Sequence, residues 1–121
     1  MTGRPRAIGL DEVERIDLDN DSWSRMVVTE ETAPETNSSL GFSRFTPGTT
    51  TDTVRHEVEE LAYVLAGEGE LRLPDGTVEF GPDDALHIPP ETWHAVANTG
   101  DRDVVMVFTF PYPDYPPTDR D

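Results

Sequence analysis

From Pro47 to Gly69 the chain reads Pro-Gly-Thr-Thr-Thr-Asp-Thr-Val-Arg-His-Glu-Val-Glu-Glu-Leu-Ala-Tyr-Val-Leu-Ala-Gly-Glu-Gly. This segment places a histidine, His56, and a carboxylate, Glu60, four residues apart. Short apolar and β-branched runs bounded by glycine and proline are typical of β-strands. The segment therefore predicts a strand-rich region that carries side chains able to bind a metal ion.

A second segment, Ile88 to Asn98, reads Ile-Pro-Pro-Glu-Thr-Trp-His-Ala-Val-Ala-Asn and adds His94. Two histidines and one carboxylate from separate strands form a ligand set that leaves coordination positions open, which suits a catalytic divalent metal. We therefore predict His56, Glu60 and His94 as metal ligands. Their even spacing in a strand places His56 and Glu60 on one face. The ligand set does not choose among Fe, Mn, Zn and Ni.

The rest of the chain alternates short β-type runs with turn residues. Pro74-Asp75-Gly76 lies between two alternating runs and predicts a hairpin. The most apolar run, 104–110, is expected to be a central strand. No helix is evident, so nine or ten strands predict an all-β sandwich or small barrel.

At 121 residues the chain is expected to form a single domain, 1–121. We expect the barrel to span about 24–110, after an extended N-terminal lead-in over 1–20. A proline-rich tail over 111–121 is expected not to join a sheet, because proline lacks the N–H donor that a sheet ladder needs.

Composition excludes several kinds of chemistry. The chain has no cysteine and all nine of its basic residues are arginine, so thiol nucleophiles, zinc-thiolate sites and lysine Schiff bases are ruled out. With 25 acidic residues and a net charge of −16, the surface should repel nucleic acids and anionic membranes. No apolar run approaches the roughly 20 residues of a membrane span, and no secretory signal is evident. We expect a cytoplasmic protein.

The two segments resemble the signature motifs of the cupin family. The matching residues are Gly48, His56, Glu60 and Gly67 in the first motif, and Pro89, His94 and Asn98 in the second. The resemblance implies a double-stranded β-helix, or jelly-roll barrel, with the metal site inside. It also implies a homodimer, in which the apolar final strand and the tail could cover a partner.

Three positions depart from the cupin pattern. Val54 replaces the first motif histidine, and Asp83 and Glu91 replace two glycines at turns, where we expect only the loop shape to change. Because position 54 supplies no ligand, either a two-histidine, one-carboxylate site with about three open positions remains, or the barrel holds no metal.

His87 lies between Leu86 and Ile88 and is expected on the outer sheet face. It remains a candidate catalytic residue as a general base, because histidine titrates near neutral pH.

Two classes of function follow. The first is a metal-dependent enzyme, of oxygenase, isomerase, lyase or cyclase type, acting on a small organic molecule. The second is a non-catalytic domain that binds a small-molecule ligand at a degenerate metal site. A metal-free epimerase or cyclase that uses His87 or His94 as its base is a third possibility.

Overall fold

The computed structural model describes residues 3–121, so Met1 and Thr2 of the predicted lead-in lie outside the described residues. Between residues 3 and 121 the chain forms eleven strands and two short 3-10 helices, with no α-helix. The elements are η1 (Leu10–Glu12), β1 (Ile16–Asp17), η2 (Asp19–Asp21), β2 (Trp23–Val28), β3 (Ser39–Phe45), β4 (Val54–His56), β5 (Glu60–Ala66), β6 (Gly69–Leu73), β7 (Gly76–Phe80), β8 (Ala85–Ile88), β9 (Ala95–Asn98), β10 (Val104–Phe110) and β11 (Thr118–Arg120).

The larger sheet has six antiparallel strands in the order β1-β2-β3-β10-β5-β8. β10 lies between β3 and β5, which confirms the prediction of a central strand. Alternate side chains of a strand point to opposite faces. Val104, Met106, Phe108 and Phe110 therefore point the same way, into the barrel, and are at most 7% exposed.

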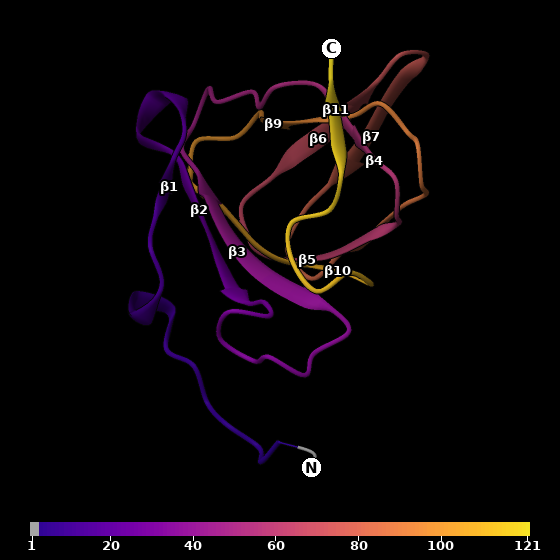
Figure 1. Cartoon of the computed structure of the whole chain (residues 1–121). Coiled ribbons are helices and arrows are strands. Elements are labelled where there is room, and N and C mark those ends of the chain that lie inside the picture. Colours follow the sequence, from indigo (N-terminus) through magenta and orange to yellow (C-terminus); the bar gives the residue numbers. More distant parts are fainter. Residues whose placement is uncertain (1–2) are drawn as a thin grey trace.

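A smaller layer closes the barrel opposite the larger sheet (Figure 1). β6 pairs with β7 through the predicted hairpin and with β9 on its other side. An isolated bridge from Val54 to His94 joins β4 to the segment that precedes β9. Apolar side chains from both layers form one core, and this arrangement confirms the predicted double-stranded β-helix.

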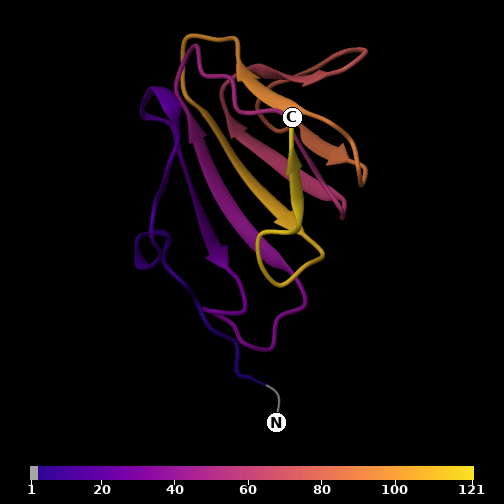
Figure 2. The same cartoon turned by 45° about the horizontal axis from the view of Figure 1, so that its top comes forward.

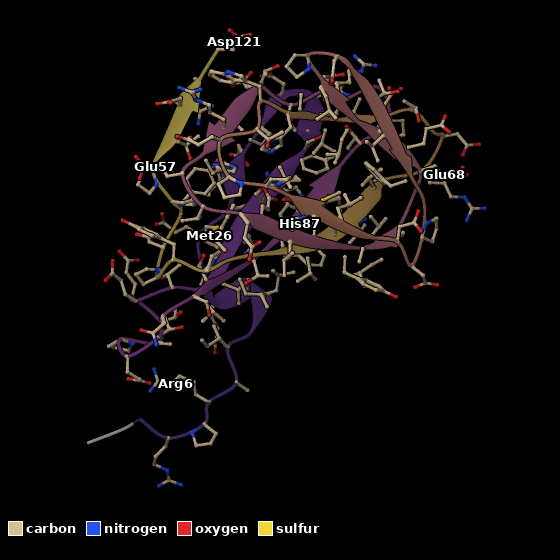
Figure 3. The ribbon with its side chains drawn as sticks, turned by 90° about the vertical axis from the view of Figure 1, so that its right-hand side faces the viewer. Arg6, Met26, Glu57, Glu68, His87 and Asp121 are labelled. Atoms are coloured by element: carbon tan, nitrogen blue, oxygen red, sulfur yellow. The ribbon has the colours of Figure 1, made fainter. Side chains whose placement is uncertain are left out.

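The N-terminal lead-in is more structured than the expected extended segment. Its strand β1 pairs with β2 and becomes the edge of the larger sheet. The Arg25 guanidinium donates hydrogen bonds to the carbonyl oxygens of Leu10 and Val13, which fixes the segment before β1. Residues closer to the N-terminus, including Arg6, extend away from the barrel (Figure 3).

The prediction that the proline-rich tail cannot join a sheet is wrong. After β10 the chain turns back over the barrel (Figure 2), and β11 pairs with β4 in antiparallel register, with Thr118 opposite His56. The four prolines of the tail all precede Thr118, so the residues of β11 keep their N–H groups. The ladder extends past both ends of β11, because the Glu57 N–H donates to the Pro117 carbonyl and the Asp121 N–H donates to the Thr53 carbonyl.

Two turns have the left-handed backbone conformation that glycine favours, although other residues occupy these positions. Asp83 and Glu91, at the two positions where cupins have glycine, have φ values of 71° and 59°. Side chains other than glycine adopt this left-handed region at a cost of roughly 1–2 kcal/mol. The expected change of loop shape stays a prediction, and both turns carry the backbone strain of a side chain at positive φ.

Glu91→Gly is expected to stabilise the protein. Glycine removes the strain at φ 59° while keeping the hydrogen bond that the residue 91 N–H donates to the His56 carbonyl. After the entropy cost of glycine, we expect a net gain of about 0.5–1 kcal/mol and a melting temperature higher by about 2–4 °C. Calorimetry checks this, with Glu57→Gly as the control, since Glu57 is exposed and lacks a positive φ. A melting temperature unchanged by Glu91→Gly would show that the turn is unstrained.

The outer face of β5 is apolar and exposed. Leu61, Tyr63 and Leu65 alternate along this strand and are 44%, 43% and 49% exposed. The homodimer stays a prediction, as do the cytoplasmic location and the absence of nucleic-acid and membrane partners. In the described part of the chain, no helix has the length and apolar character that crossing a membrane requires.

Candidate metal centre

The three predicted ligands come from three different elements that meet inside the barrel. His56 is the last residue of β4, Glu60 is the first residue of β5, and His94 directly precedes β9. Residues 57–59 form a turn between β4 and β5, so His56 and Glu60 do not lie on one continuous strand. Their convergence results from this turn, and the explanation by even spacing in a single strand is wrong.

The three side chains lie close together, with both histidines buried and the Glu60 side chain 13% exposed. His56 and His94 are each 4% exposed. The Glu60 Oε1 atom lies 3.4 Å from His56 Nε2 and 3.5 Å from His94 Nε2. One ligand atom from each of the three residues lies within 4.8 Å of the others. The three residues therefore come together in the structure, as the sequence predicts.

The hydrogen bond of His94 determines which of its nitrogens faces Glu60. His94 Nδ1 lies 2.8 Å from the carbonyl oxygen of Thr92. A carbonyl oxygen only accepts hydrogen bonds, so Nδ1 must carry the proton. A neutral imidazole has a single N–H, and His94 therefore presents the lone pair of Nε2 to the centre of the cluster.

The hydrogen bond of His56 with a tail residue, Thr118, likewise determines which nitrogen of His56 faces Glu60. His56 Nδ1 lies 2.7 Å from the hydroxyl of Thr118, and this hydroxyl also lies 2.8 Å from the Pro116 carbonyl oxygen. Because the carbonyl can only accept, the single hydroxyl proton of Thr118 is used there. The hydroxyl oxygen must then accept from His56 Nδ1, which leaves the Nε2 lone pair directed at Glu60.

This geometry fits a divalent metal ion. Two Nε2 lone pairs and a carboxylate converge in a buried space, and such a set of acceptors needs a cation among them. The nitrogen–oxygen distances of 3.4 and 3.5 Å exceed those of a tight charged hydrogen bond, about 2.7–2.9 Å. A metal about 2.0–2.2 Å from each ligand requires neighbouring ligands roughly 3–3.5 Å apart. His56, Glu60 and His94 would hold this metal.

Without a metal, a proton can take the cation's place. Burial alone would raise the pKa of the Glu60 carboxyl, but hydrogen bonds and charge from His56 and His94 outweigh burial and lower it. Burial alone would lower the pKa of His94, but its bond and attraction to Glu60, with the Thr92 carbonyl, raise it above 6.5. The metal-free centre is thus a carboxylate that attracts a proton to His94.

Metal affinity should therefore depend on pH. The lowered pKa of Glu60 stabilises the metal-free fold above about pH 4.5, and the raised pKa of His94 stabilises it below about pH 6.5. Both contributions are therefore complete between these values, and that of His94 disappears as pH rises through its folded-state pKa. Zn²⁺ must displace that proton, so below this pKa its dissociation constant should rise about tenfold per pH unit. Titration calorimetry from pH 8 to 5.5 measures it. A constant affinity would contradict binding through His94.

A cavity of about 320 Å³ opens from the cluster. Its apolar wall consists of Leu18, Phe45, Val54, Val96, Met106, Phe108, Phe110 and Tyr115. Hydroxyl, carboxylate and guanidinium groups also line it, namely those of Ser24, Ser43, Thr49, Thr50, Thr51, Asp17, Asp19, Asp52 and Arg120. A cavity that combines an apolar wall with convergent polar groups is the usual form of a small-molecule site.

His87 is not brought to this cavity. It lies on β8 with its side chain 57% exposed, and its Nε2 atom is 2.9 Å from Glu59 Oε1 on the outer surface (Figure 3 labels His87). Asn98 is buried but serves the fold, because its amide group donates to the carbonyl oxygens of Phe45 and Arg102. The cavity-lining residue that replaces the missing ligand is Val54, at the start of β4.

Sequence reasoning missed the contribution of the C-terminal segment. The Tyr115 ring packs edge-on against His56, with 5.5 Å between ring centroids, and against Phe110, at 5.8 Å. Arg120 reaches the cavity and pairs with Asp52 at 3.3 Å. The spacing of residues gave no signal for these contacts, since they depend on how the tail folds back.

Comparison with known proteins agrees with the fold. The cupin domain family matches residues 41–110, more than half of the chain, and the protein belongs to this family. It is 30% identical over 106 residues to polyketide synthase CurC of Streptomyces cyaneus, covering 87% of this chain and 68% of CurC.

Two further similarities are more limited. Auxin-binding protein T85 of Nicotiana tabacum is 37% identical over 73 residues, and the match covers 52% of this chain but only 39% of that protein. The crystal structure of the polyketide cyclase RemF from Streptomyces resistomycificus superposes with a TM-score of 0.80 at 22% identity, covering 97% of this chain and 85% of RemF. This last likeness is one of fold.

Proposed function

We propose that this cupin is a metal-dependent enzyme that acts on a small, carbonyl-bearing organic molecule, with cyclisation of a polyketide-type substrate as the reaction. The observation that carries the proposal is the buried His56–Glu60–His94 cluster, with both Nε2 lone pairs directed at Glu60, at the end of an aromatic-lined cavity. A divalent metal held by these residues would supply Lewis-acid activation of a carbonyl oxygen.

The cavity walls suit a flat, partly apolar substrate. Phe108 and Phe110 lie edge-to-face with 5.7 Å between ring centroids, and Met106 lies on the same face of β10. Such surfaces hold aromatic or extended conjugated molecules and keep water from the reacting carbon atoms. The hydroxyl of Thr51, which accepts from the Val96 N–H and keeps its own proton, offers a hydrogen bond to an additional carbonyl group of the substrate.

Tyr115 provides a hydrogen-bond donor close to the cluster. Burial is the main reason that the pKa of its phenol is raised above 10, so the hydroxyl stays protonated at neutral pH. A neutral phenol at the cavity wall can donate to a substrate oxygen as negative charge develops on it. Tyr115 is 42% exposed, so water screens this bond in part.

The similarity to CurC supports the choice of substrate class. CurC is named as a polyketide synthase, and polyketide chains carry repeated carbonyl groups whose neighbouring carbon atoms are acidic. A cavity that combines a carbonyl-activating centre with aromatic walls fits this chemistry. Oxygenase chemistry is the competing reaction type for the same ligand set.

The experiment separates these reaction types. Protein loaded with Zn²⁺ is mixed with a 1,3-diketone in D₂O, and exchange at the central carbon is followed by NMR while dissolved oxygen is recorded. The proposal expects exchange that is faster than with free Zn²⁺ and is lost on His94→Ala, without oxygen consumption. Oxygen uptake by the iron-loaded protein, without exchange by the zinc-loaded protein, would replace cyclisation by an oxygenase function.

A binding function without turnover is the second candidate. In the described part of the chain, the titratable groups of the cluster are its three metal-ligand candidates, and the other carboxylates that line the cavity, those of Asp17, Asp19 and Asp52, are exposed. The similarity to an auxin-binding protein over half of the chain also favours this candidate. Retention of an aromatic acid in the cavity with neither exchange nor oxygen uptake would select it.

A further inference from the structure

We infer that the C-terminal strand is a working part of the metal centre, and that Thr118 is a positioning residue that holds His56 with its proton on Nδ1. The inference deepens the proposed function, since it concerns the same site and rests on it for its consequence. Its own evidence is the hydrogen-bond chain from His56 through Thr118 to Pro116.

The direction of this chain is determined by its last member. The Pro116 carbonyl oxygen can only accept, so it fixes the hydroxyl proton of Thr118, and the hydroxyl oxygen can then only accept from His56. With the proton held on Nδ1, the Nε2 atom of His56 is free to bind a metal. Hydrogen bonds of this kind orient histidine ligands, and losing one weakens metal affinity by about 10–100-fold.

The hydrogen-bond chain from His56 to Pro116 requires that β11 stay docked on β4. The two strands pair in register from His56–Thr118 to Val54–Arg120. Arg55 lies 2.9 Å from Asp119, and this ion pair joins the middle of the two strands. Thr118 therefore reaches His56 from a segment 62 residues away in sequence only because these contacts hold the tail in place.

Docking of the tail and metal binding must then favour each other. If the docked tail raises metal affinity, the bound metal must stabilise the docked tail by the same free energy. The Glu57 and Asp121 N–H groups bond across the β4–β11 pair, to Pro117 and Thr53, and report docking directly. Zn²⁺ is expected to slow hydrogen exchange of both amides.

The decisive measurement is the tautomer of His56. In metal-free, ¹⁵N-labelled protein at pH 9, we expect wild-type His56 to carry its proton on Nδ1. Thr118→Val keeps the shape of the side chain but cannot accept the bond, so it should give a mixture with the Nε2-protonated form. Thr118→Ser keeps the hydroxyl and should restore the wild-type tautomer.

Zn²⁺ affinity provides the second readout. By titration calorimetry, Thr118→Val should bind about 10–100-fold more weakly than wild type, and Thr118→Ser within about threefold of it. A residue with a merely structural role would lower the melting temperature of Thr118→Val but would not change the tautomer. If Thr118→Val fails to fold, Thr118→Ala replaces it in both measurements.

The possible failures are distinguishable. A wild-type His56 protonated on Nε2, or a Thr118→Val variant with the tautomer and Zn²⁺ affinity of Thr118→Ser, would overturn the inference while leaving a metal enzyme intact. A wild-type protein that shows the expected tautomer but catalyses no reaction would overturn the proposed function and leave the role of Thr118 standing.

Discussion

His94→Ala is expected to abolish retention of the metal. In protein purified without added metal or a histidine tag, elemental analysis should find close to one Fe, Mn, Zn or Ni per wild-type chain and almost none per variant chain. His94 is 4% exposed and its Nε2 atom lies 3.5 Å from Glu60 Oε1, so the substitution removes one of three ligands. Zn²⁺ affinity should fall by more than the roughly 10–100-fold caused by losing a supporting residue.

His87→Ala is the matched control for this prediction. It also removes a histidine, but from the outer face of β8, where the side chain is 57% exposed and paired with Glu59. This variant should keep its metal and its activity. Equal metal content in both variants would show that the metal is bound elsewhere. If wild-type protein holds no metal and gains none on dialysis, the missing ligand at position 54 has inactivated the site.

The candidate ligands could be predicted from sequence because they lie in two segments that resemble the cupin motifs and because histidine and carboxylate side chains are typical metal ligands. A carboxylate within an apolar run, as at Glu60, is costly unless a cation or hydrogen bonds compensate for its burial. The central strand and the hairpin were also predictable, since apolar runs and turn residues act through neighbours in sequence. The predicted ligands converge in the structure, although through a turn after His56 rather than along one strand.

The C-terminal part of the site could not be predicted. Pairing of β11 with β4 joins residues more than sixty positions apart, and three exposed or half-exposed polar residues show no periodic pattern. The prolines before Thr118 suggested a tail outside the sheet, whereas the carbonyl oxygens of Pro116 and Pro117 accept hydrogen bonds that hold the tail in place. A hydrogen bond such as that of Thr118 with His56 becomes visible only when the tail is placed.

Val54→His is expected to strengthen metal binding. Val54 begins β4, lines the cavity and lies on the same face as His56, two residues further along the strand. Its backbone exchanges hydrogen bonds with His94, at 3.0 and 2.9 Å, so a side chain at position 54 starts beside a ligand. A fourth donor would complete a three-histidine, one-carboxylate site, and we expect Zn²⁺ affinity to rise on the order of tenfold or more.

The same substitution should reduce turnover, because it takes up one of about three open positions that substrate would use on an octahedral metal. Val78→His is the matched control, since it makes the same exchange of residues on β7, outside the cavity, where Val78 is 45% exposed. Zn²⁺ titration of both variants measures the difference. Tighter binding by Val54→His alone would mean that the cavity face of β4 still has the geometry of a four-ligand centre, and that Val54 trades metal affinity for open coordination positions. Equal affinity in both variants would mean that position 54 no longer points at the metal.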